Sequence, residues 1–481
     1  MASPLRGERL RDTALEPDGR KAARIGVMDF RSAPMRAFHF SWLAFFLSFV
    51  AWFGVAPLMA VVRDDLKLTK AQVGNTVVAS VAITIFARFA TGWLCDRFGP
   101  RRTYAVLLLI GALPVMGIGF SHTYHSFLLF RLAIGVVGAS FVVTQCHTSV
   151  MFSRKVVGTA NALTAGWGNL GGGVAQWVMP LLFGAFLGVG ADKFLSWRLA
   201  MVVPGVLLLL TGIAYYCFTQ DTPDGSAFAP RTGGQAFWEA VADYRVWLLF
   251  VLYGACFGVE VTVDNVAALY FRDSFHLTLK LAGLLASLIG MMNLFARALG
   301  GMAGDWAGNL WGLRGRARLL GMTIFGEGLA MILFSRLTWL GGAAAAFLLF
   351  GLLVCMACGV TYAVVPLLRP RAVGSVSGIV GAGGSFGAVL AALLFKSESI
   401  SGETAFCILG TVVAASAFCV LPLRFDAAPI PETDAEMRPV LMSADRLAWH
   451  TASTDLEVVS RTKLETGELR MDRRGLALPP G

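Results

Sequence analysis

The chain has few charged residues for its length. Asp, Glu, Lys and Arg together make up 15% of its 481 residues, whereas hydrophobic residues make up 56%. A soluble domain usually has about a quarter charged residues and needs them to cover its core. The composition therefore excludes an ordinary soluble protein and indicates an integral membrane protein surrounded by lipid.

Histidine and cysteine are also scarce, with six and eight residues. The cysteines lie in or beside apolar stretches, so the sequence predicts neither a disulfide framework nor a metal site. Cys355 and Cys358 have the spacing of a redox pair, but their continuous apolar surroundings favour packing. No nucleophile–base pair or cofactor motif stands outside the apolar stretches, so we expect a protein that is not an enzyme and needs no cofactor.

Long apolar runs are what the sequence has in abundance. A run of about 18 residues is long enough to cross the hydrocarbon core of a bilayer. The runs that meet this length are 38–62, 71–95, 103–121, 124–151, 156–189, 197–218, 246–271, 280–304, 318–336, 338–366, 372–396 and 402–424. They predict an all-α integral membrane protein with twelve transmembrane helices.

The basic residues predict the orientation and the division of the chain. Most of the 40 Lys and Arg residues lie in the tails and in alternate loops, which is the pattern of cytosolic segments. We therefore expect cytosolic tails at 1–37 and 425–481, and we expect the second tail to be disordered. Because the basic residues follow this membrane-orientation pattern, the net charge of +10 does not indicate a nucleic-acid partner. A cytosolic linker at 219–245 separates a six-helix half at 38–218 from a second at 246–424.

Two motifs recur in both halves. The pattern R-x3-G-x3-D begins at Arg88 and again at Arg297, and a glycine-dense stretch at 165–173 has a counterpart at 381–387. Two pseudo-symmetric halves with matching intramembrane features are typical of transporters, whose substrate lies between the halves near the middle of the bilayer.

Arg88 and Arg297 are the first candidates for a binding site. A central intramembrane arginine costs at least several kcal/mol unless it faces a cavity or a partner. Neither has an acidic residue within one helical turn, and the two occupy equivalent positions in opposite halves. A planar oxyanion between them would match the guanidinium fork. Arg131 has no counterpart in the repeat and is interpreted as structural.

The glycine-dense stretches are candidates for close contact with the same ligand. Gly168 and Gly384 expose bare backbone, and each is followed by a polar side chain, Asn169 or Ser385. Close helix crossing is a second reason for such glycines, and the two interpretations are compatible.

Two further sets of residues include charged side chains. Tyr253, Phe257, Glu260 and Asp264 fall on one face of a helix. The two carboxylates indicate either a proton path or solvated groups near the outer surface. On the cytosolic side, charged residues after the second and eighth helices predict a latch between the halves: Asp96, Arg97, Arg101, Asp305 and Arg314.

These motifs resemble a known family. Residues 165–173 and 381–384 resemble the paired signatures of the nitrate/nitrite porter family of the major facilitator superfamily. Residues 35–42, 258–260 and 262–265 are similar to the high-affinity nitrate transporters of plants and algae. The resemblance covers about residues 35–425 and implies the major facilitator fold.

The resemblance also implies roles for single residues. Arg88 and Arg297 match two arginines that clamp the substrate, and Asn169 matches the signature asparagine. Tyr253 and Phe257 match aromatic residues that line and occlude the site. Ser385 departs from the pattern, because the second signature usually has Asn there, and this bears on the preference between nitrate and nitrite.

The predicted function is import of nitrate, with nitrite as a second substrate, by proton-coupled alternating access at the plasma membrane. The substrate, protons and the lipid bilayer are the expected partners. Members of the plant and algal branch often work with a small single-span accessory membrane protein, which is a candidate partner here. Exchange of nitrate for nitrite and a nitrate sensor with little flux are the alternatives.

Overall fold

A computed structural model of the chain describes most of the helical region. The described residues up to 423 belong to one compact unit, and the few described residues after 425 belong to another. In the second unit the structure describes only strands β1 (Arg470–Met471) and β2 (Ala477–Leu478), which pair antiparallel. The remaining predictions for the two tails fall largely outside the described residues, which are 21–226, 235–277, 279–396, 400–423, 470–471 and 477–478.

The first part of the chain makes six long helical passes. Caps fix where some of them begin: Thr69 and Gln72 form a capping box before the second pass, and Asp192 accepts two backbone N–H bonds before the sixth. The elements are α1 (Ala33–Phe53), η2 (Ala56–Leu58), α2 (Met59–Leu66), α3 (Lys70–Phe98), α4 (Pro100–Gly117), η3 (Ile118–Phe120), α5 (Tyr124–Gly135), η4 (Val136–Ala139), α6 (Ser140–Met151), α7 (Val157–Gly188) and α8 (Lys193–Phe218).

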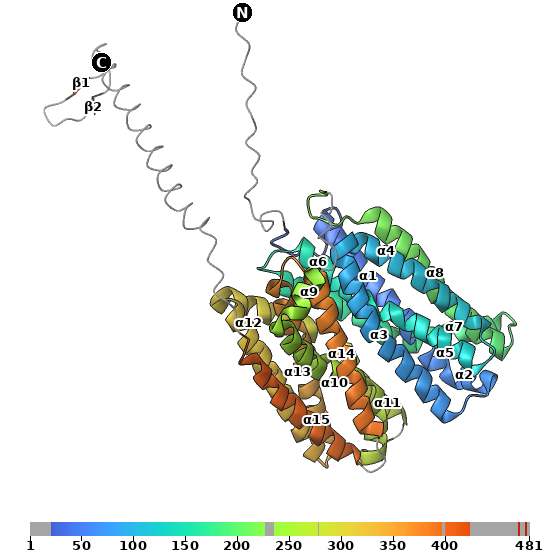
Figure 1. The fold of residues 1–481 in the computed structure, drawn as a ribbon. Coiled ribbons are helices and arrows are strands. Elements are labelled where there is room, and N and C mark those ends of the chain that lie inside the picture. The colour runs from blue at the N-terminus through green and yellow to red at the C-terminus, as the bar shows by residue number, and fades with distance from the viewer. Residues whose placement is uncertain are drawn as a thin grey trace, which may run out of the picture. The chain divides into compact units, whose positions relative to one another are not determined.

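The second part begins with a short helix inside the predicted linker. Its elements are α9 (Gln235–Ala242), α10 (Tyr244–Phe275), α11 (Leu279–Met292), α12 (Ala296–Arg336), α13 (Leu340–Leu368), α14 (Val373–Lys396), α15 (Gly402–Ser416) and η5 (Ala417–Val420). In Figure 1 the blue to green helices of the first part and the yellow-green to orange helices of the second form two groups, with α3 and α14 side by side between them.

Eleven described stretches are long and apolar enough to cross a membrane, and one of them contains two crossings. That stretch, Leu284–Arg336, has 53 residues. A helix of this length would extend about 80 Å at 1.5 Å per residue, more than twice the thickness of the hydrocarbon core. Within it, Gly312 has a non-helical backbone with φ of 63° and ψ of −159°. The chain reverses there, and the twelve predicted crossings are present.

Glycines let the two halves approach closely at two crossings. A Cβ at Gly92 of α3 would lie 3.1 Å from the carbonyl carbon of Gly374 in α14. A Cβ at Gly301 of α12 would lie 2.9 Å from the carbonyl carbon of Gly158 in α7. Such contacts leave no room for a side chain. Gly92 and Gly301 are repeat-related, as are Gly158 and Gly374, so the same crossing is built twice.

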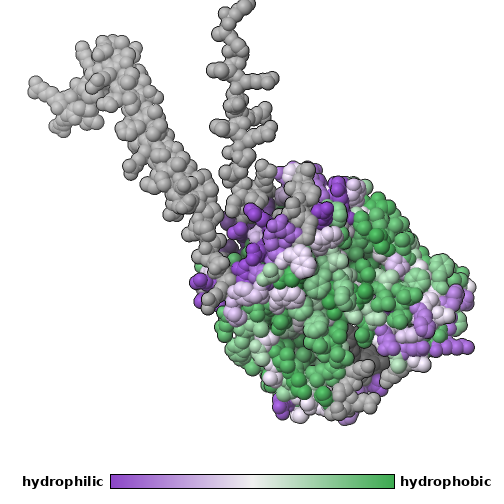
Figure 2. Space-filling model, viewed as in Figure 1, coloured by the Kyte–Doolittle hydropathy of each residue, from purple (hydrophilic) through white to green (hydrophobic). Residues whose placement is uncertain are grey.

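The outside of the helical unit is apolar. Figure 2 shows a broad hydrophobic band over the helices, with hydrophilic residues at its two ends. Large apolar side chains of the helices, such as Phe86 of α3 and Trp177 of α7, are 69% and 78% exposed. A soluble protein would bury them, whereas lipid is a favourable environment for them. The chain is therefore a multi-pass membrane protein.

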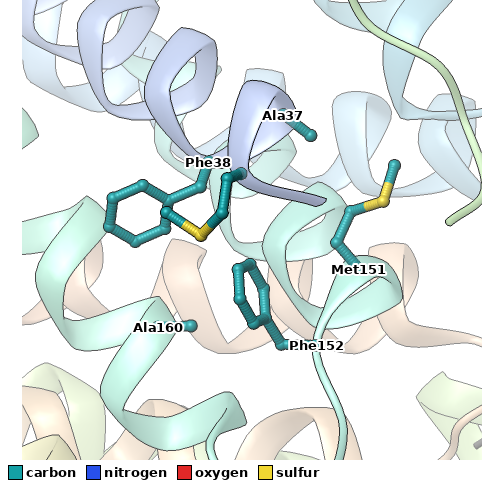
Figure 3. Close-up of a cluster of buried hydrophobic side chains, with 6 residues drawn as sticks. Ala37, Phe38, Met151, Phe152 and Ala160 are labelled. Carbon is teal, nitrogen blue, oxygen red and sulfur yellow. The ribbon is translucent and has the colours of Figure 1, made fainter. Parts of the chain in front are cut away.

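The first described residues are anchored to the loop between α6 and α7. The N–H of Ala22 donates to the carbonyl of Met151, and the N–H of Ser153 donates to the carbonyl of Ala22, each at 3.0 Å. Beside this bridge, ends of three helices share a hydrophobic cluster (Figure 3). This packing fixes the loop from which α7 starts. The cluster consists of Met35, Ala37, Phe38, Met151, Phe152 and Ala160.

Replacing Gly301 should show how tightly the halves are fitted. In Gly301→Val the new side chain overlaps Gly158, and overpacking of this kind costs about 1–3 kcal/mol. We expect a lower thermal midpoint of the detergent-purified protein than in Gly184→Val, since Gly184 of α7 has no neighbour within 4 Å. Equal midpoints for the two variants would contradict the close crossing.

Candidate functional site

Arg88 and Arg297 lie deep inside the molecule and close to one aromatic ring. Arg88 comes from α3 and Arg297 from α12, and their side chains are 0% and 1% exposed. Their guanidinium carbons lie 5.3 Å and 5.8 Å from the centre of the Phe257 ring. The structure thus brings together two arginines that are 209 positions apart in the sequence.

Arg297 has an acidic partner that the local sequence did not reveal. Its Nη2 lies 2.5 Å from Oε2 of Glu260, and its Nε donates to Oδ1 of Asn293 at 3.0 Å. Nδ2 of Asn293 donates to the other Glu260 oxygen at 2.7 Å. No acidic residue lies within one helical turn of Arg297 in the sequence, and its partner Glu260 comes from another helix, α10.

Arg88 is not neutralised in this way. Its Nη1 donates to the carbonyl oxygen of Gly381 in α14, and its guanidinium carbon lies 5.4 Å from the centre of the Phe141 ring. In the part of the chain that the structure describes, Nε and Nη2 of Arg88 have no hydrogen-bond partner and Arg88 has no ion pair. Together with Arg297 and Glu260, Arg88 leaves the centre with one net positive charge.

Aromatic rings close the centre. The rings of Tyr253 and Phe257 are stacked 5.2 Å apart at an angle of 3°, and Phe141 lies nearly parallel to Tyr253 at 5.9 Å. Tyr362 meets Tyr253 edge-on at 5.1 Å. The Tyr253 hydroxyl is buried and has no partner among the described residues. Phe141 and Tyr362 were not predicted, because nothing local distinguishes them from other apolar residues of their helices.

The signature glycines have different neighbours. A Cβ at Gly384 would lie 2.6 Å from the Phe257 ring and 2.9 Å from the Tyr253 ring, so its absence makes room for both rings at the centre. A Cβ at Gly168 would instead overlap the ring of Phe45 in α1, so Gly168 serves helix packing. Ser385, beside Gly384, is buried.

Asn169 lies on α7, one turn after the point where α7 contacts Arg297 of α12. One turn before it, a Cβ at Gly166 would lie 3.6 Å from the Cβ of Arg297. Nδ2 of Asn169 is buried, and no described residue accepts a hydrogen bond from it. Like Arg88 and Tyr253, Asn169 therefore offers an unused donor.

The two carboxylates of α10 have different surroundings. Glu260 is buried against Arg297, whereas the Asp264 side chain is exposed. Burial of Glu260 argues against a solvated group near the outer surface at that position, and the proton path stays a prediction for both carboxylates. The described residues contain no group of three His, Cys, Asp or Glu that could hold a metal ion.

Beyond Arg88 in α3 and Arg297 in α12, each of these helices carries an aspartate near the loop that follows. Each aspartate accepts hydrogen bonds from the first residues of a helix in the opposite half. Asp96 of α3 accepts from the N–H groups of Gly374 and Ser375 of α14, at 2.9 Å and 2.6 Å. Asp305 of α12 accepts from the N–H groups of Gly158 and the next residue of α7, at 3.0 Å and 2.6 Å. A carboxylate there also complements the helix dipole. These two repeat-related contacts are called the latch below.

Arg316 joins the latch in place of the predicted Arg314. Nη1 of Arg316 lies 3.1 Å from Oδ1 of Asp305, and Nη2 donates at 2.7 Å to the carbonyl of Arg154 in the other half. Arg314 is exposed. Both residues were visible as a basic pair, but only the helical rotation after Gly312 decides which one faces Asp305.

The other two predicted latch residues contact their own half. Arg101 donates from its backbone N–H to Asp221 at 2.8 Å, and its guanidinium carbon lies 4.5 Å from the centre of the Tyr216 ring. Burial raises the pKa of Asp221, and Arg101 opposes that rise. Arg97 lies over the neighbouring Phe98 ring at 5.9 Å.

Comparison with known proteins identifies the family. The model of the Major Facilitator Superfamily matches residues 41–392. The chain belongs to this superfamily. It is 39% identical over 84% of its length to High affinity nitrate transporter 2.5 of Arabidopsis thaliana, covering 82% of that protein. It is 38% identical to Nitrate transporter 2.1 of Chlamydomonas reinhardtii, over 78% of this chain and 71% of that one. Within the superfamily, the chain thus belongs to the nitrate/nitrite porter family.

Solved structures of other superfamily members share the fold. The proton:xylose symporter XylE superposes with a TM-score of 0.62 at 14% identity, covering 81% of this chain and 96% of that one. The human organic anion transporter MFSD10 gives 0.60 at 13% identity, covering 81% and 100%. The predicted twelve-helix major facilitator fold is confirmed. The prediction that the chain is not an enzyme is also confirmed, because the relatives are transporters.

The Asp305–Arg316 pair should stabilise the latch measurably. Removing one partner of a buried ion pair costs about 3–5 kcal/mol, because the other charge stays buried. We expect Asp305→Asn and Arg316→Gln each to lower the thermal midpoint, and the double variant to lose less than the two losses combined. Arg314→Gln is the matched control and should leave the midpoint unchanged; a loss equal to that of Arg316→Gln would contradict the assignment.

Proposed function

We propose that the chain imports nitrate, and nitrite as a second substrate, with the anion held between Arg88 and Arg297. The relatives named above are nitrate transporters, and the protein of Nostoc punctiforme that is 28% identical over 80% of this chain is named a nitrate/nitrite transporter. The centre offers one net positive charge, which attracts a monovalent anion. Asn169 and Tyr253 add unpaired donors to those of Arg88.

The free edge of Arg88 is the observation that carries this proposal. Nε and Nη2 belong to one planar guanidinium, and neither has a partner among the described residues. Two parallel N–H groups of this kind fit two oxygens of a planar oxyanion, which a lysine cannot reproduce. The aromatic faces around the edge exclude water, so the hydrogen bonds would act in a low dielectric.

Glu260 gives a physical reason for proton coupling. An anion that binds Arg297 competes with Glu260, which lies 2.5 Å from the same guanidinium. A displaced carboxylate buried among α10, α12 and α13 would have no counter-charge, and an isolated buried charge is very unfavourable. Glu260 therefore takes up a proton when nitrate binds. Asp264, being exposed, serves at most as the entry point for that proton.

The membrane potential sets how many protons are needed. Moving one anion into a negative interior costs about 2.3 kcal/mol per 100 mV. One proton per nitrate cancels the charge, whereas two make the potential drive uptake. We infer symport with more than one proton.

The latch supports alternating access. Its residues lie at the end of the helices that carries Arg97, Arg101, Arg154 and Arg316, which the distribution of basic residues predicts to be cytosolic. Asp96 and Asp305 hold the two halves together at that end. Release of the anion into the cytosol requires both contacts to break, and the halves then rock apart. The plasma membrane location and cytosolic tails belong to the same proposal.

Voltage-clamped cells that express the chain alone test the transport mode. Nitrate added outside should evoke an inward positive current that grows as the outside pH falls, because protons exceed nitrate in each cycle. Nitrate uptake without current would favour either one proton per nitrate or exchange with nitrite. Binding without uptake would favour a sensor, and silence that ends on co-expression of a single-span accessory protein would identify that partner.

Substitution of the clamp tests the site. Arg88→Lys and Arg297→Lys keep the charge but lose the planar fork, which is worth about 1.5–3 kcal/mol per charged hydrogen bond, so we expect roughly tenfold or greater loss of nitrate affinity. Arg131→Lys is the matched control, because Arg131 is also buried but donates to the backbone carbonyl of Trp52. Normal nitrate affinity in either clamp variant would overturn the proposed site.

A further inference from the structure

One buried carboxyl has no part in the clamp or the latch. Glu327 lies in the second membrane crossing of α12 and is 0% exposed. Neither of its carboxyl oxygens has a hydrogen-bond partner within the described ranges. No repeat relation or family motif drew attention to it in the sequence.

The groups around Glu327 connect it to the clamp. Cys256 and Glu260 of α10 lie close enough to interact with it electrostatically, and so does Cys355 of α13. On the side of α15, the neighbouring Gly328 packs against the backbone of Gly410 without a charged group. Glu327 is thus surrounded by thiols, apolar backbone and one acid, and makes no ion pair with any described residue.

Thiols bridge the two acids. The Cys358 thiol donates to Oε2 of Glu260 at 3.4 Å, and the Cys256 thiol lies close to Cys358. Cys256 in turn lies close enough to Glu327 to interact with it electrostatically. The two carboxyls are therefore joined by a short chain of side chains, and the charge state of each affects the other.

Electrostatics restrict the state of such a group. An ionised carboxylate with no hydrogen bond and no counter-charge is far more unfavourable in a protein interior than its neutral acid. Glu260 nearby is an acid, so it adds repulsion. In the described conformation the Glu327 carboxyl group is therefore protonated and neutral. Its ionisation requires a rearrangement that admits water or a cation.

We propose that Glu327 is a proton-binding site of the transport cycle, coupled to the anion through Glu260. This rests on the proposed function. Glu327 takes one proton from the outer solution, keeps it as a neutral carboxyl while the halves rearrange, and returns it to the inner solution. Glu260 carries a second proton while nitrate occupies Arg297. Two protons and one nitrate then move inward together, with one net positive charge.

The experiment uses the purified full chain in liposomes. Uptake of nitrate is measured under an imposed pH gradient, and nitrate–nitrate counterflow is measured without a gradient. Glu327→Gln keeps the shape of a neutral carboxyl but cannot release a proton. We expect it to lose about tenfold or more of gradient-driven uptake while counterflow continues. Glu327→Asp should restore a response to the gradient.

Glu403→Gln is the control, because Glu403 is an exposed carboxylate in the first turn of α15. It should match the wild type in both assays. Gradient-driven uptake that persists in Glu327→Gln would overturn the inference and leave the proposed function intact. A wild type that performs counterflow but ignores the gradient would overturn the symport, and this inference with it. If Glu327→Gln does not fold, an unchanged pH profile in Glu327→Asp would overturn the assignment.

Discussion

The ion pair between Arg297 and Glu260 determines the character of the centre. It joins α12 to α10 at 2.5 Å and cancels one of two arginine charges that would otherwise face each other. Without it, two buried guanidinium groups would lie beside the Phe257 ring with no negative charge to balance them. With it, the centre has a single excess positive charge, located on Arg88. The surrounding rings, glycines and unpaired donors are arranged around that charge.

Charge compensation also explains how the proposed substrate site and the proposed proton sites would influence each other. Glu260 is a partner of Arg297 and a neighbour of Glu327, so anything that binds Arg297 changes the electrostatic environment of both acids. The inside of a membrane protein offers little water to screen such effects. Coupling between the sites then follows from a few charges in contact and does not require a long mechanical pathway.

The interface between the halves is governed by the internal repeat. Gly92 and Gly301 remove side chains at equivalent crossings, and Asp96 and Asp305 bind equivalent helix starts. Each half therefore contributes one arginine helix and one glycine-rich helix to the same pair of contacts. Such an arrangement can open at one end and remain packed at the other, which alternating access requires.

The sequence by itself determined the features that depend on local composition and on repetition. The length of the apolar runs predicted the twelve crossings, because the bilayer requires a minimum span. The repeat identified Arg88, Arg297, Asp96 and Asp305, because rare charges in a span stand out against apolar neighbours.

Tertiary structure decided which charges meet. Glu260 reaches Arg297 from another helix, Arg316 replaces Arg314 in the latch after the reversal at Gly312, and Glu327 is left without a partner. None of this follows from spacing along one helix. Contacts between helices depend on the rotation and depth of each helix in the bundle, and these are fixed only when all the helices pack.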